Sequence, residues 1–261
     1  MGRILVIGDI HGGYKGLVQC LERSNFDKDS DTLISLGDVA DGWSQVAECV
    51  EELLSIKNLI AIKGNHDVWA LEWLKYGRSL ALWLNQGGKA TYNSYIDRPE
   101  LMAEHAERFF DKQHNYYVDD QNRAFVHGGF VSQKGLGHDA QQANYYWDRD
   151  LWNLALMADR AKIEYAEDVN ITNGNRFLRH KEIFIGHTTT MMLEAKGNMK
   201  ESKDPNQVLN GRITVPMNRC NVWNLDTGGG YSGKITIMDV DTKEYWQSDP
   251  MKELYPDEQG R

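Results

Sequence analysis

Short apolar runs recur along this chain, and each leads into a loop in which glycine stands beside Asp, Asn or His. The first three runs cover residues 3–7, 32–36 and 59–62, with helical spacing of apolar residues over 14–23 and 44–55 between them. Near-continuous apolar runs are typical of strands buried on both faces, and their alternation with helices is typical of βαβ units. The pattern therefore predicts an α/β fold.

Four more strands are expected in the second half of the chain, at 123–126, 182–185, 222–225 and 234–240. The last of these alternates between apolar and polar residues, which favours a position at or near a sheet edge. We treat residues 1–261 as one domain, because this length suits one large α/β unit.

Three segments depart from this repeat. Residues 68–122 carry a dense apolar helical pattern, with Pro99 placed to open a second helix, and are expected to form a helical insertion. Residues 194–218 are polar, with Gly, Asn and Pro, and are expected to form a long loop. The acidic tail from Ser248 is expected to fray.

Five short motifs stand directly after strand-like runs. In open α/β sheets, ligand-binding groups cluster outside the carboxyl ends of the strands, so these motifs are expected to meet. Any one of them alone is a common turn sequence, and it is their joint occurrence that indicates a site. They are Gly8-Asp9-Ile10-His11-Gly12, Gly37-Asp38-Val39-Ala40-Asp41-Gly42, Gly64-Asn65-His66-Asp67, His127-Gly128-Gly129 and Gly186-His187-Thr188.

The Asp, Asn and His side chains in these motifs are oxygen and imidazole donors of the kind that bind metal ions. Asp9 and His11 can face one ion, and Asp38 has two carboxylate oxygens with which it can bridge two ions. A second ion can be completed by three further ligands, namely Asn65, His127 and His187. Mixed oxygen and nitrogen donors suit Mn²⁺, Fe or Zn²⁺ better than Ca²⁺, and a set without cysteine disfavours a structural zinc site. Two divalent cations about 3.5–4 Å apart form a centre that hydrolyses phosphate esters.

The composition limits the partners and the compartment. The net charge of −9 argues against a broad nucleic-acid surface, which needs a basic face. The N-terminal apolar run is too short for a signal peptide, and no stretch approaches the roughly 20 apolar residues of a membrane span. The three cysteines form no Cys-x-x-Cys pair and are expected to be reduced. We therefore expect a cytoplasmic protein that does not associate with membranes.

The motifs and their order resemble those of the calcineurin-like metallophosphoesterases, and within them the bacterial and phage phosphoprotein phosphatases. The resemblance runs from residue 8 to about 240. It includes Trp147-Asp148-Arg149, similar to the family's Trp-x-Arg, and Asn224-Leu225-Asp226-Thr227-Gly228, similar to its Asn-x-Asp-Thr-Gly. It implies a four-layer sandwich of two mixed β-sheets flanked by helices.

The resemblance also implies roles for individual residues. Asp9, His11 and Asp38 would hold the first metal, and Asp38 with Asn65, His127 and His187 the second. His66 would be the general acid, oriented by Asp41, and Arg149 would bind the phosphate oxygens, with Asn65 and His66 also facing the substrate. The expected cofactors are two divalent ions, most simply Mn²⁺.

This sequence departs from the family's pattern at one place. Where the family has Arg-Gly after the second aspartate, this chain has Gly42-Trp43, so one phosphate-binding arginine is missing. Arginine binds phosphate through two parallel hydrogen bonds, and its loss is not neutral. Lys63, Lys89 and Arg176 are candidate replacements, and the sequence does not rank them.

The expected activity is hydrolysis of phosphate monoesters, as in phosphoprotein serine/threonine phosphatases, by in-line attack of a metal-bridging hydroxide. The alternative is a nucleotide hydrolase that splits dinucleoside polyphosphates or acts on nucleic-acid ends, since aromatic side chains in the insertion can stack on bases. These aromatics are more simply explained as core residues, and they are Trp69, Trp73, Trp83, Tyr92 and Tyr95. A non-catalytic scaffold is disfavoured, because all six ligands and His66 are retained.

Overall fold

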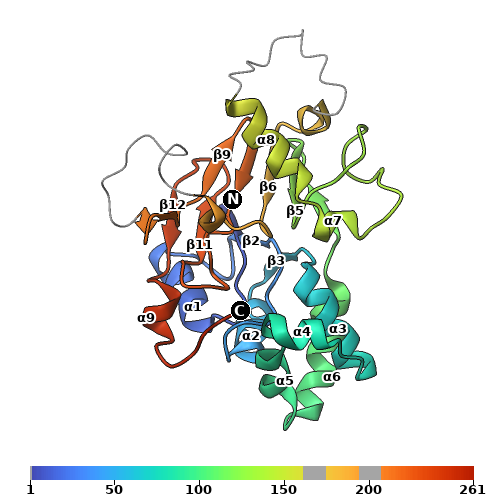
Figure 1. Ribbon diagram of the computed structural model, residues 1–261, viewed down its shortest axis with the longest axis vertical. Coiled ribbons are helices and arrows are strands. Elements are labelled where there is room, and N and C mark those ends of the chain that lie inside the picture. The colour runs from blue at the N-terminus through green and yellow to red at the C-terminus, as the bar shows by residue number, and fades with distance from the viewer. Residues whose placement is uncertain (1, 161–174, 194–206) are drawn as a thin grey trace.

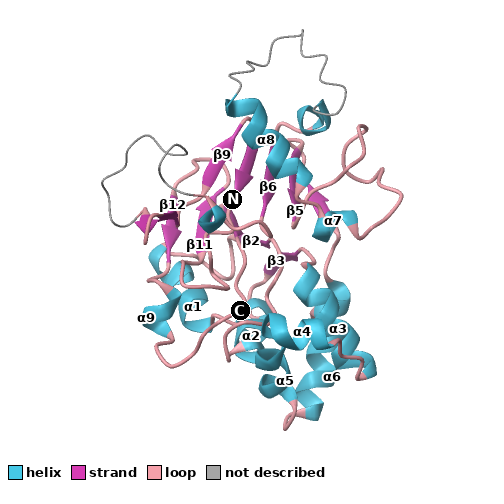
Figure 2. Cartoon of the chain, in the orientation of Figure 1, coloured by secondary structure: helices cyan, strands magenta, loops and turns pink. Residues whose placement is uncertain are grey.

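The computed structural model describes residues 2–160, 175–193 and 207–261 (Figure 1). Two mixed β-sheets lie at its centre with helices outside them, as the sequence predicts (Figures 1 and 2). The first sheet has the order β12-β11-β1-β2-β3, in which β1, β2 and β3 are parallel and β11 runs antiparallel to β1. Its strands are β1 (Ile4–Ile7), β2 (Thr32–Ser35), β3 (Asn58–Ala61), β11 (Thr236–Asp239) and β12 (Tyr245–Gln247).

The second sheet has the order β4-β5-β6-β10-β9, with β5, β6 and β10 parallel and an antiparallel strand at each edge. Its strands are β4 (Tyr116–Val118), β5 (Arg123–Val126), β6 (Glu182–Ile185), β9 (Met217–Arg219) and β10 (Val222–Asn224). A two-stranded hairpin adds β7 (Val208–Leu209) and β8 (Arg212–Ile213).

Helices cover the outer face of each sheet. Beside the first sheet lie α1 (Tyr14–Arg23), α2 (Val46–Leu54), α3 (Asn65–Tyr76), α4 (Ala81–Trp83), α5 (Lys89–Tyr95), α6 (Pro99–Arg108) and α9 (Met251–Leu254). Beside the second lie α7 (Asn144–Trp147) and α8 (Asp150–Arg160). A π-helical turn at Leu84–Gly88 joins α4 to α5, and short 3₁₀ turns lie at Phe110–Lys112, Asn175–Arg179 and Thr190–Met192.

Three clusters of buried apolar residues hold the layers of the fold together. One lies between the two sheets and draws residues from both, among them Val6 and Ile34 from the first and Phe125 and Phe184 from the second. The other two pack each sheet against its own helices. Burying both faces of a sheet explains the near-continuous apolar strands read in the sequence.

Three segment predictions need correction. The insertion is helical only up to Lys112, because Tyr116–Val118 pairs with β5 as an edge strand. The loop expected at 194–218 contains β7, β8 and part of β9 from Val208 onward, and its first part, 194–206, lies outside the described residues.

The tail from Ser248 does not fray. It forms α9, buries Met251 and Tyr255, and ends with the backbone N–H of Arg261 donating to the Gly230 carbonyl at 2.8 Å. Its polar composition is misleading because a few apolar anchors and many hydrogen bonds hold it. By contrast, the strand predicted at 234–240 is β11, second from the edge of its sheet as expected.

Candidate metal centre

The carboxyl ends of five parallel strands from the two sheets place the ligand side chains together. Asp9 and His11 follow β1, Asp38 follows β2, and Asn65 opens α3 after β3. From the second sheet, His127 follows β5 and His187 follows β6. We call these six residues the metal cradle, and all six are buried.

The cradle contains two triads that share one residue. Asp9, His11 and Asp38 form the first, and Asp38, His127 and His187 the second; within each triad the ligand atoms lie within 4.8 Å of one another. Asp38 Oδ2 is 3.5 Å from His11 Nε2 and 3.3 Å from His127 Nε2, so this carboxylate stands between the triads. Asn65 Oδ1 lies 3.2 Å from His127 Nε2 and belongs to the second group. The residues that the sequence names as candidate ligands therefore lie together in the structure.

The hydrogen-bonding pattern of the cradle fits a pair of cations. His11 Nδ1 donates to the Ala40 carbonyl at 3.0 Å and His127 Nδ1 to the Leu36 carbonyl at 2.8 Å, which leaves each Nε2 facing the cradle. In metal sites, a hydrogen bond donated by the ring nitrogen that does not bind the metal fixes the orientation of the imidazole. Asp38 Oδ2 and both ring nitrogens of His187 are buried with no hydrogen-bond partner among the described residues. Most buried polar atoms in proteins have a partner, and an ion or an ordered water is a common one where the protein supplies none.

The backbone at the cradle is locally strained. His11, Asp38 and His187 have φ values of 49°, 50° and 65°, and Asp41 has 72°. Side chains other than glycine seldom adopt this left-handed region, and such residues cluster at functional sites. Here the conformation turns each side chain back toward the shared centre.

Burial and mutual charge set the protonation of the cradle. Burial, reinforced by the nearby Asp226, raises the pKa of Asp9 well above its ordinary value. Burial alone would also raise the pKa of Asp38, but His127 and His66 reverse the effect and hold it well below the ordinary value. Burial lowers the pKa of His11 and His187, which favours neutral imidazoles there, whereas at His127 the effect of burial is outweighed by the nearby Asp38, which raises its pKa to about 9. Neutral imidazole is the form that binds metals.

His66 and Asp41 form a buried dyad beside the cradle. Asp41 Oδ2 accepts from His66 Nδ1 at 2.6 Å, and His66 Nε2 is buried without a partner among the described residues. The insertion holds Asp41 in place: Trp83 Nε1 donates to it at 2.8 Å and the Thr91 hydroxyl at 2.6 Å. The sequence predicted the dyad but not these supports, since an indole and a hydroxyl far along the chain carry no motif.

Arg149 lies beside His187, on the second-sheet side of the cradle. Its Nη1 donates to the His187 carbonyl at 3.0 Å and to the Thr188 hydroxyl at 2.9 Å. Next to it, the half-exposed Trp147 ring lies 6.0 Å from the His187 ring and 5.2 Å from the Trp69 ring, centre to centre. Trp69 in turn stacks edge-on to His66 at 5.1 Å. Two indoles therefore border both the dyad and the second triad.

The other aromatics of the insertion are mostly core residues, as expected. Trp73, Trp83 and Tyr95 are buried, whereas Tyr92 is partly exposed. A small pocket of about 170 Å³ lies against Trp69, Glu72, Arg78, Leu80 and Trp83.

Asp67 is a structural residue of the site that sequence reasoning named only as part of a motif. Its Oδ1 accepts from the backbone N–H groups of Val39 and Ala40 at 2.9 and 3.0 Å, and its Oδ2 accepts from Gly64 N–H and the Gln113 amide. This carboxylate therefore fastens the loop that carries Asp38 to the start of the helix that carries Asn65 and His66.

None of the three candidate replacements for the missing arginine has a described contact with the cradle. Lys89 is exposed at the start of α5, Lys63 is half-buried after β3, and Arg176 is buried with its Nη2 3.6 Å from Asp148 Oδ2. Arg261, which the sequence gave no reason to consider, does reach the cradle: its Nη1 is 3.2 Å from His11 Nε2.

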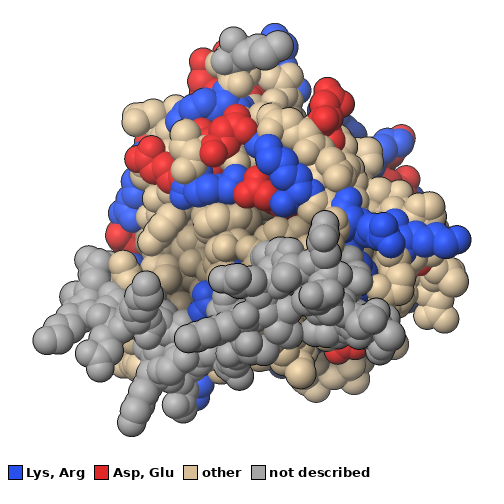
Figure 3. Space-filling view, turned by 90° about the horizontal axis from the view of Figure 1, so that it is seen from above, with Lys and Arg blue, Asp and Glu red and all other residues tan. Residues whose placement is uncertain are grey.

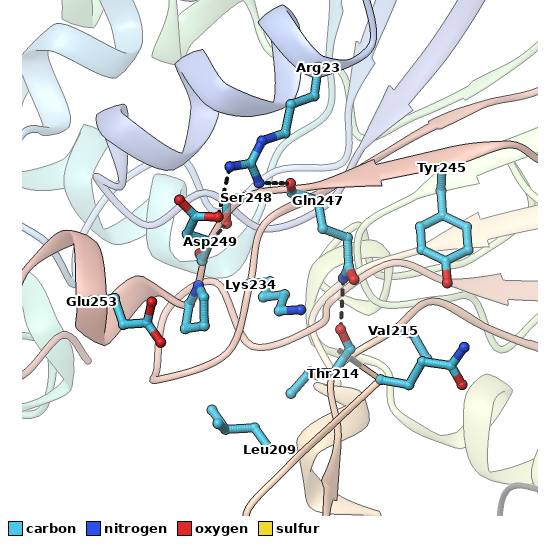
Figure 4. A pocket seen from close by; sticks show the side chains of 12 residues that line it. Arg23, Leu209, Thr214, Val215, Lys234, Tyr245, Gln247, Ser248, Asp249 and Glu253 are labelled. Atoms are coloured by element: carbon cyan, nitrogen blue, oxygen red, sulfur yellow. Dashed lines mark hydrogen bonds and ion pairs between the residues drawn. The ribbon is translucent and has the colours of Figure 1, made fainter. Parts of the chain in front are cut away.

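A larger pocket of about 570 Å³ lies elsewhere, between α1, β12 and α9 (Figure 4). It is lined by polar groups already bonded to each other, such as Arg23 with Asp249 and Gln247 with the Thr214 carbonyl. No metal-ligand side chain of the cradle lines it, so volume alone does not mark the site.

Comparison with known proteins agrees with this geometry. The chain matches the calcineurin-like phosphoesterase family over residues 2–200. It is 26% identical to a symmetrical bis(5′-nucleosyl)-tetraphosphatase of Pseudomonas syringae, over 94% of this chain and 91% of that protein. It is 36% identical to serine/threonine-protein phosphatase 1 of Salmonella typhimurium, over 40% of this chain and 44% of that protein. A metallophosphoesterase structure from Sphaerobacter thermophilus superposes with a TM-score of 0.54 at 18% identity, covering 97% and 94% of the two chains.

The chain belongs to the calcineurin-like phosphoesterase family. It is a hydrolase of the dinuclear, metal-dependent phosphoesterase class, and its fold is the one expected from its sequence. The relatives are named for different phosphorylated substrates, so the comparisons establish the class of enzyme but not its substrate.

Proposed function

We propose that this protein hydrolyses phosphate monoesters, as serine/threonine phosphoprotein phosphatases do. The observation that supports it is the His66–Asp41 dyad at 2.6 Å beside two metal-ligand triads that share Asp38. A serine or threonine phosphate leaves as an alkoxide, which needs a proton in the transition state. Cleavage of a phosphoanhydride releases a phosphate group, a far better leaving group, and gains less from a general acid.

Each residue around the cradle has one task in this proposal. Asp41 accepts the Nδ1 proton of His66 and fixes its tautomer, so Nε2 is the atom that hands a proton to the departing oxygen. Arg149 is already held by its Nη1 and presents its remaining N–H groups to the phosphoryl oxygens. Asn65 and His66 face the same space from the start of α3.

The cradle residues would hold two divalent ions, which supply Lewis acidity and a water acidified toward neutral pH. Three carboxylate or amide groups and three imidazoles suit Mn²⁺ best, with Fe or Zn²⁺ as the next choices. We further expect a phosphorylated protein or small phosphoester as substrate, and the cytoplasm as the location.

Hydrolysis of dinucleoside polyphosphates is the second candidate. Two observations favour it: the similarity to tetraphosphatases extends along nearly the whole chain, and Trp69 and Trp147 border the cradle where a base could stack.

The surface charge gives less support to nucleic-acid ends as substrates. On the face shown in Figure 3, basic and acidic side chains are interleaved rather than gathered into a basic stripe. Among the described helices, none has the length and apolar character needed to cross a bilayer.

The test is a substrate panel with Mn²⁺-loaded protein. It compares kcat/KM for a phosphoserine peptide, p-nitrophenyl phosphate, diadenosine tetraphosphate and a 3′-phosphorylated oligonucleotide. We expect the phosphopeptide to be turned over well and all activity to stop on chelation. Preference for diadenosine tetraphosphate by more than about 10-fold would replace the first candidate with the second, and activity that survives exhaustive chelation would overturn both.

A further inference from the structure

Arg261 lies in the metal cradle although it belongs to the far end of the sequence. Its Nη1 is 3.2 Å from His11 Nε2 and 3.9 Å from Asp38 Oδ2, and its side chain is only 11% exposed. The guanidinium also lies 5.5 Å from the centre of the Tyr231 ring, within cation–π range. In Figure 1 this end of the chain, marked C, lies in the middle of the view.

The segment 249–261, here named the C-terminal strap, is held by specific contacts to residues 43–45. Glu258 accepts hydrogen bonds from the Ser44 backbone N–H at 2.9 Å and from its hydroxyl at 2.8 Å. The Tyr255 hydroxyl donates to Gln45 at 2.8 Å, and its ring stacks on Trp43 with 5.1 Å between centres. The strap is therefore docked along the loop that follows Asp41.

That same loop carries the departure from the family pattern. Gly42 has a φ of +83°, and a Cβ at this position would lie 3.0 Å from the Cβ and carbonyl oxygen of His11, so an arginine here would be strained. Trp43 is fully buried, donates to the Gly229 carbonyl at 2.7 Å, and approaches Gly260 so closely that a Cβ on Gly260 would lie 2.8 Å from the indole. The loop that lacks the family's arginine is therefore the same loop on which the strap is docked.

We propose that Arg261 supplies the phosphate-binding guanidinium that position 42 lacks. This inference rests on the proposed function, because it assigns a partner for the phosphoryl oxygens of the same substrate. Arg149 adjoins the second triad through His187, and Arg261 adjoins the first through His11, so the two would hold a phosphate from opposite sides of the cradle. Cations held in the cradle would repel a guanidinium and attract phosphate oxygens, so in the loaded site Arg261 would be expected to pair with the substrate phosphate rather than with His11.

The test measures binding of inorganic phosphate to the Mn²⁺-loaded full chain by calorimetry, with metal content determined separately. Arg261→Gln is expected to weaken phosphate binding by about 10- to 100-fold, the range for a lost charge-assisted pair, while two metals remain bound. Arg261→Lys should restore part of the affinity, since it keeps the charge but not the planar fork. With a phosphomonoester, KM should rise more than kcat falls.

Two further variants make the result specific. Arg108→Gln removes the same charge from an exposed position on α6 and should leave phosphate binding unchanged. Glu258→Ala frees the strap from Ser44 without touching the cradle and should weaken phosphate binding in the same direction as Arg261→Gln, by a smaller factor.

The outcomes separate this inference from the proposed function. If wild-type protein hydrolyses the phosphopeptide and Arg261→Gln binds phosphate equally tightly, only the role of Arg261 is overturned. Tighter metal and phosphate binding in Arg261→Gln would show that the arginine competes with the cations, and would overturn it as well. A wild-type protein that binds Mn²⁺ and phosphate but prefers diadenosine tetraphosphate would replace the substrate and leave Arg261 in place.

Discussion

The metal cradle and the structures that surround it are built in different ways. Each cradle residue lies in the short loop after a strand or opens the helix that follows, so local backbone geometry places it. The surrounding structure, which we call the roof, consists of the insertion residues Trp83 and Thr91 and the C-terminal strap. Its contacts join residues far apart in the sequence: Thr91 is 50 positions from Asp41, and Arg261 is 250 from His11.

This difference suggests a division of labour. The proposed role of the cradle is to bind the two cations on which the hydrolysis depends. In the roof, Trp83 and Thr91 orient the dyad and Arg261 is the proposed partner of the phosphate. Loss of these residues should therefore change the rate and the selectivity while the metals remain bound. The predictions below test this division from the centre of the cradle outward.

The largest effect is expected from Asp38→Asn. An amide cannot bridge two cations with two anionic oxygens, so the variant should lose stoichiometric binding of two metals and at least about 10³-fold in kcat, beyond the loss from a single electrostatic contact. Metal content by elemental analysis and kcat with p-nitrophenyl phosphate measure this. An active variant that keeps two metals would show that Asp38 is not the bridge.

The next effect is expected from His66→Asn, between cradle and roof. Removing a general acid should slow phosphoserine peptide hydrolysis by about 10²- to 10⁴-fold and p-nitrophenyl phosphate hydrolysis much less, because nitrophenolate leaves without a proton. His138→Asn, at an exposed histidine, is the matched control and should leave both rates unchanged. Equal losses on the two substrates would remove the general-acid role.

A smaller effect is expected in the roof, from Thr91→Val. The hydroxyl that donates to Asp41 and accepts from its backbone N–H is lost, whereas the shape is nearly kept. We expect phosphoserine turnover to fall about 10-fold, as for other partners that orient active-site groups, with metal content unchanged. Thr91→Ser retains the hydroxyl and should behave like wild type. A loss of metal instead would mean that cradle and roof are not separable.

The smallest effect is expected at the base of the strap, from Asp249→Asn. The hydrogen bonds from Arg23 and Gln19 lower the pKa of Asp249, so its carboxylate stabilises the fold above its ordinary pKa of 3.8 and this contribution is lost as pH falls through the lowered value. The pair is nearly half exposed, so we expect a loss of about 0.5 kcal/mol in the free energy of unfolding at pH 7.

Urea unfolding at pH 7 and at progressively lower pH measures this difference. It should shrink toward zero in acid, whereas Asp257→Asn, at an exposed position, should be neutral throughout. A difference that grows on acidification would contradict the assigned direction of the pKa shift.

The sheets and the cradle were predictable because their signals are local. An apolar run followed by Gly-Asp or Gly-Asn-His predicts both the strand and the ligand after it, and the parallel arrangement brings five such ends together. The edge strand Tyr116–Val118 and the hairpin at 208–213 were missed, because short strands are defined by their partners rather than by their own periodicity.

The roof was not predictable in the same way. Trp83 and Thr91 lie in an ordinary amphipathic helical pattern, and nothing near them signals a hydrogen bond to Asp41. The strap looked like a fraying tail because its composition is acidic and polar, yet Glu258 and Tyr255 anchor it by side-chain contacts to residues more than 200 positions away, and Met251 is buried in a core cluster.

The sequence by itself determined the family, and through it the two-sheet sandwich, and it named the six candidate metal ligands, because the motifs that carry them are made of residues adjacent in the chain. Only the tertiary structure decided that Trp83 and Thr91 support Asp41, and that Arg261 lies in the cradle. The physical reason is that these contacts are single hydrogen bonds and ion pairs between distant segments. Their partners come within bonding distance only after the two sheets have packed.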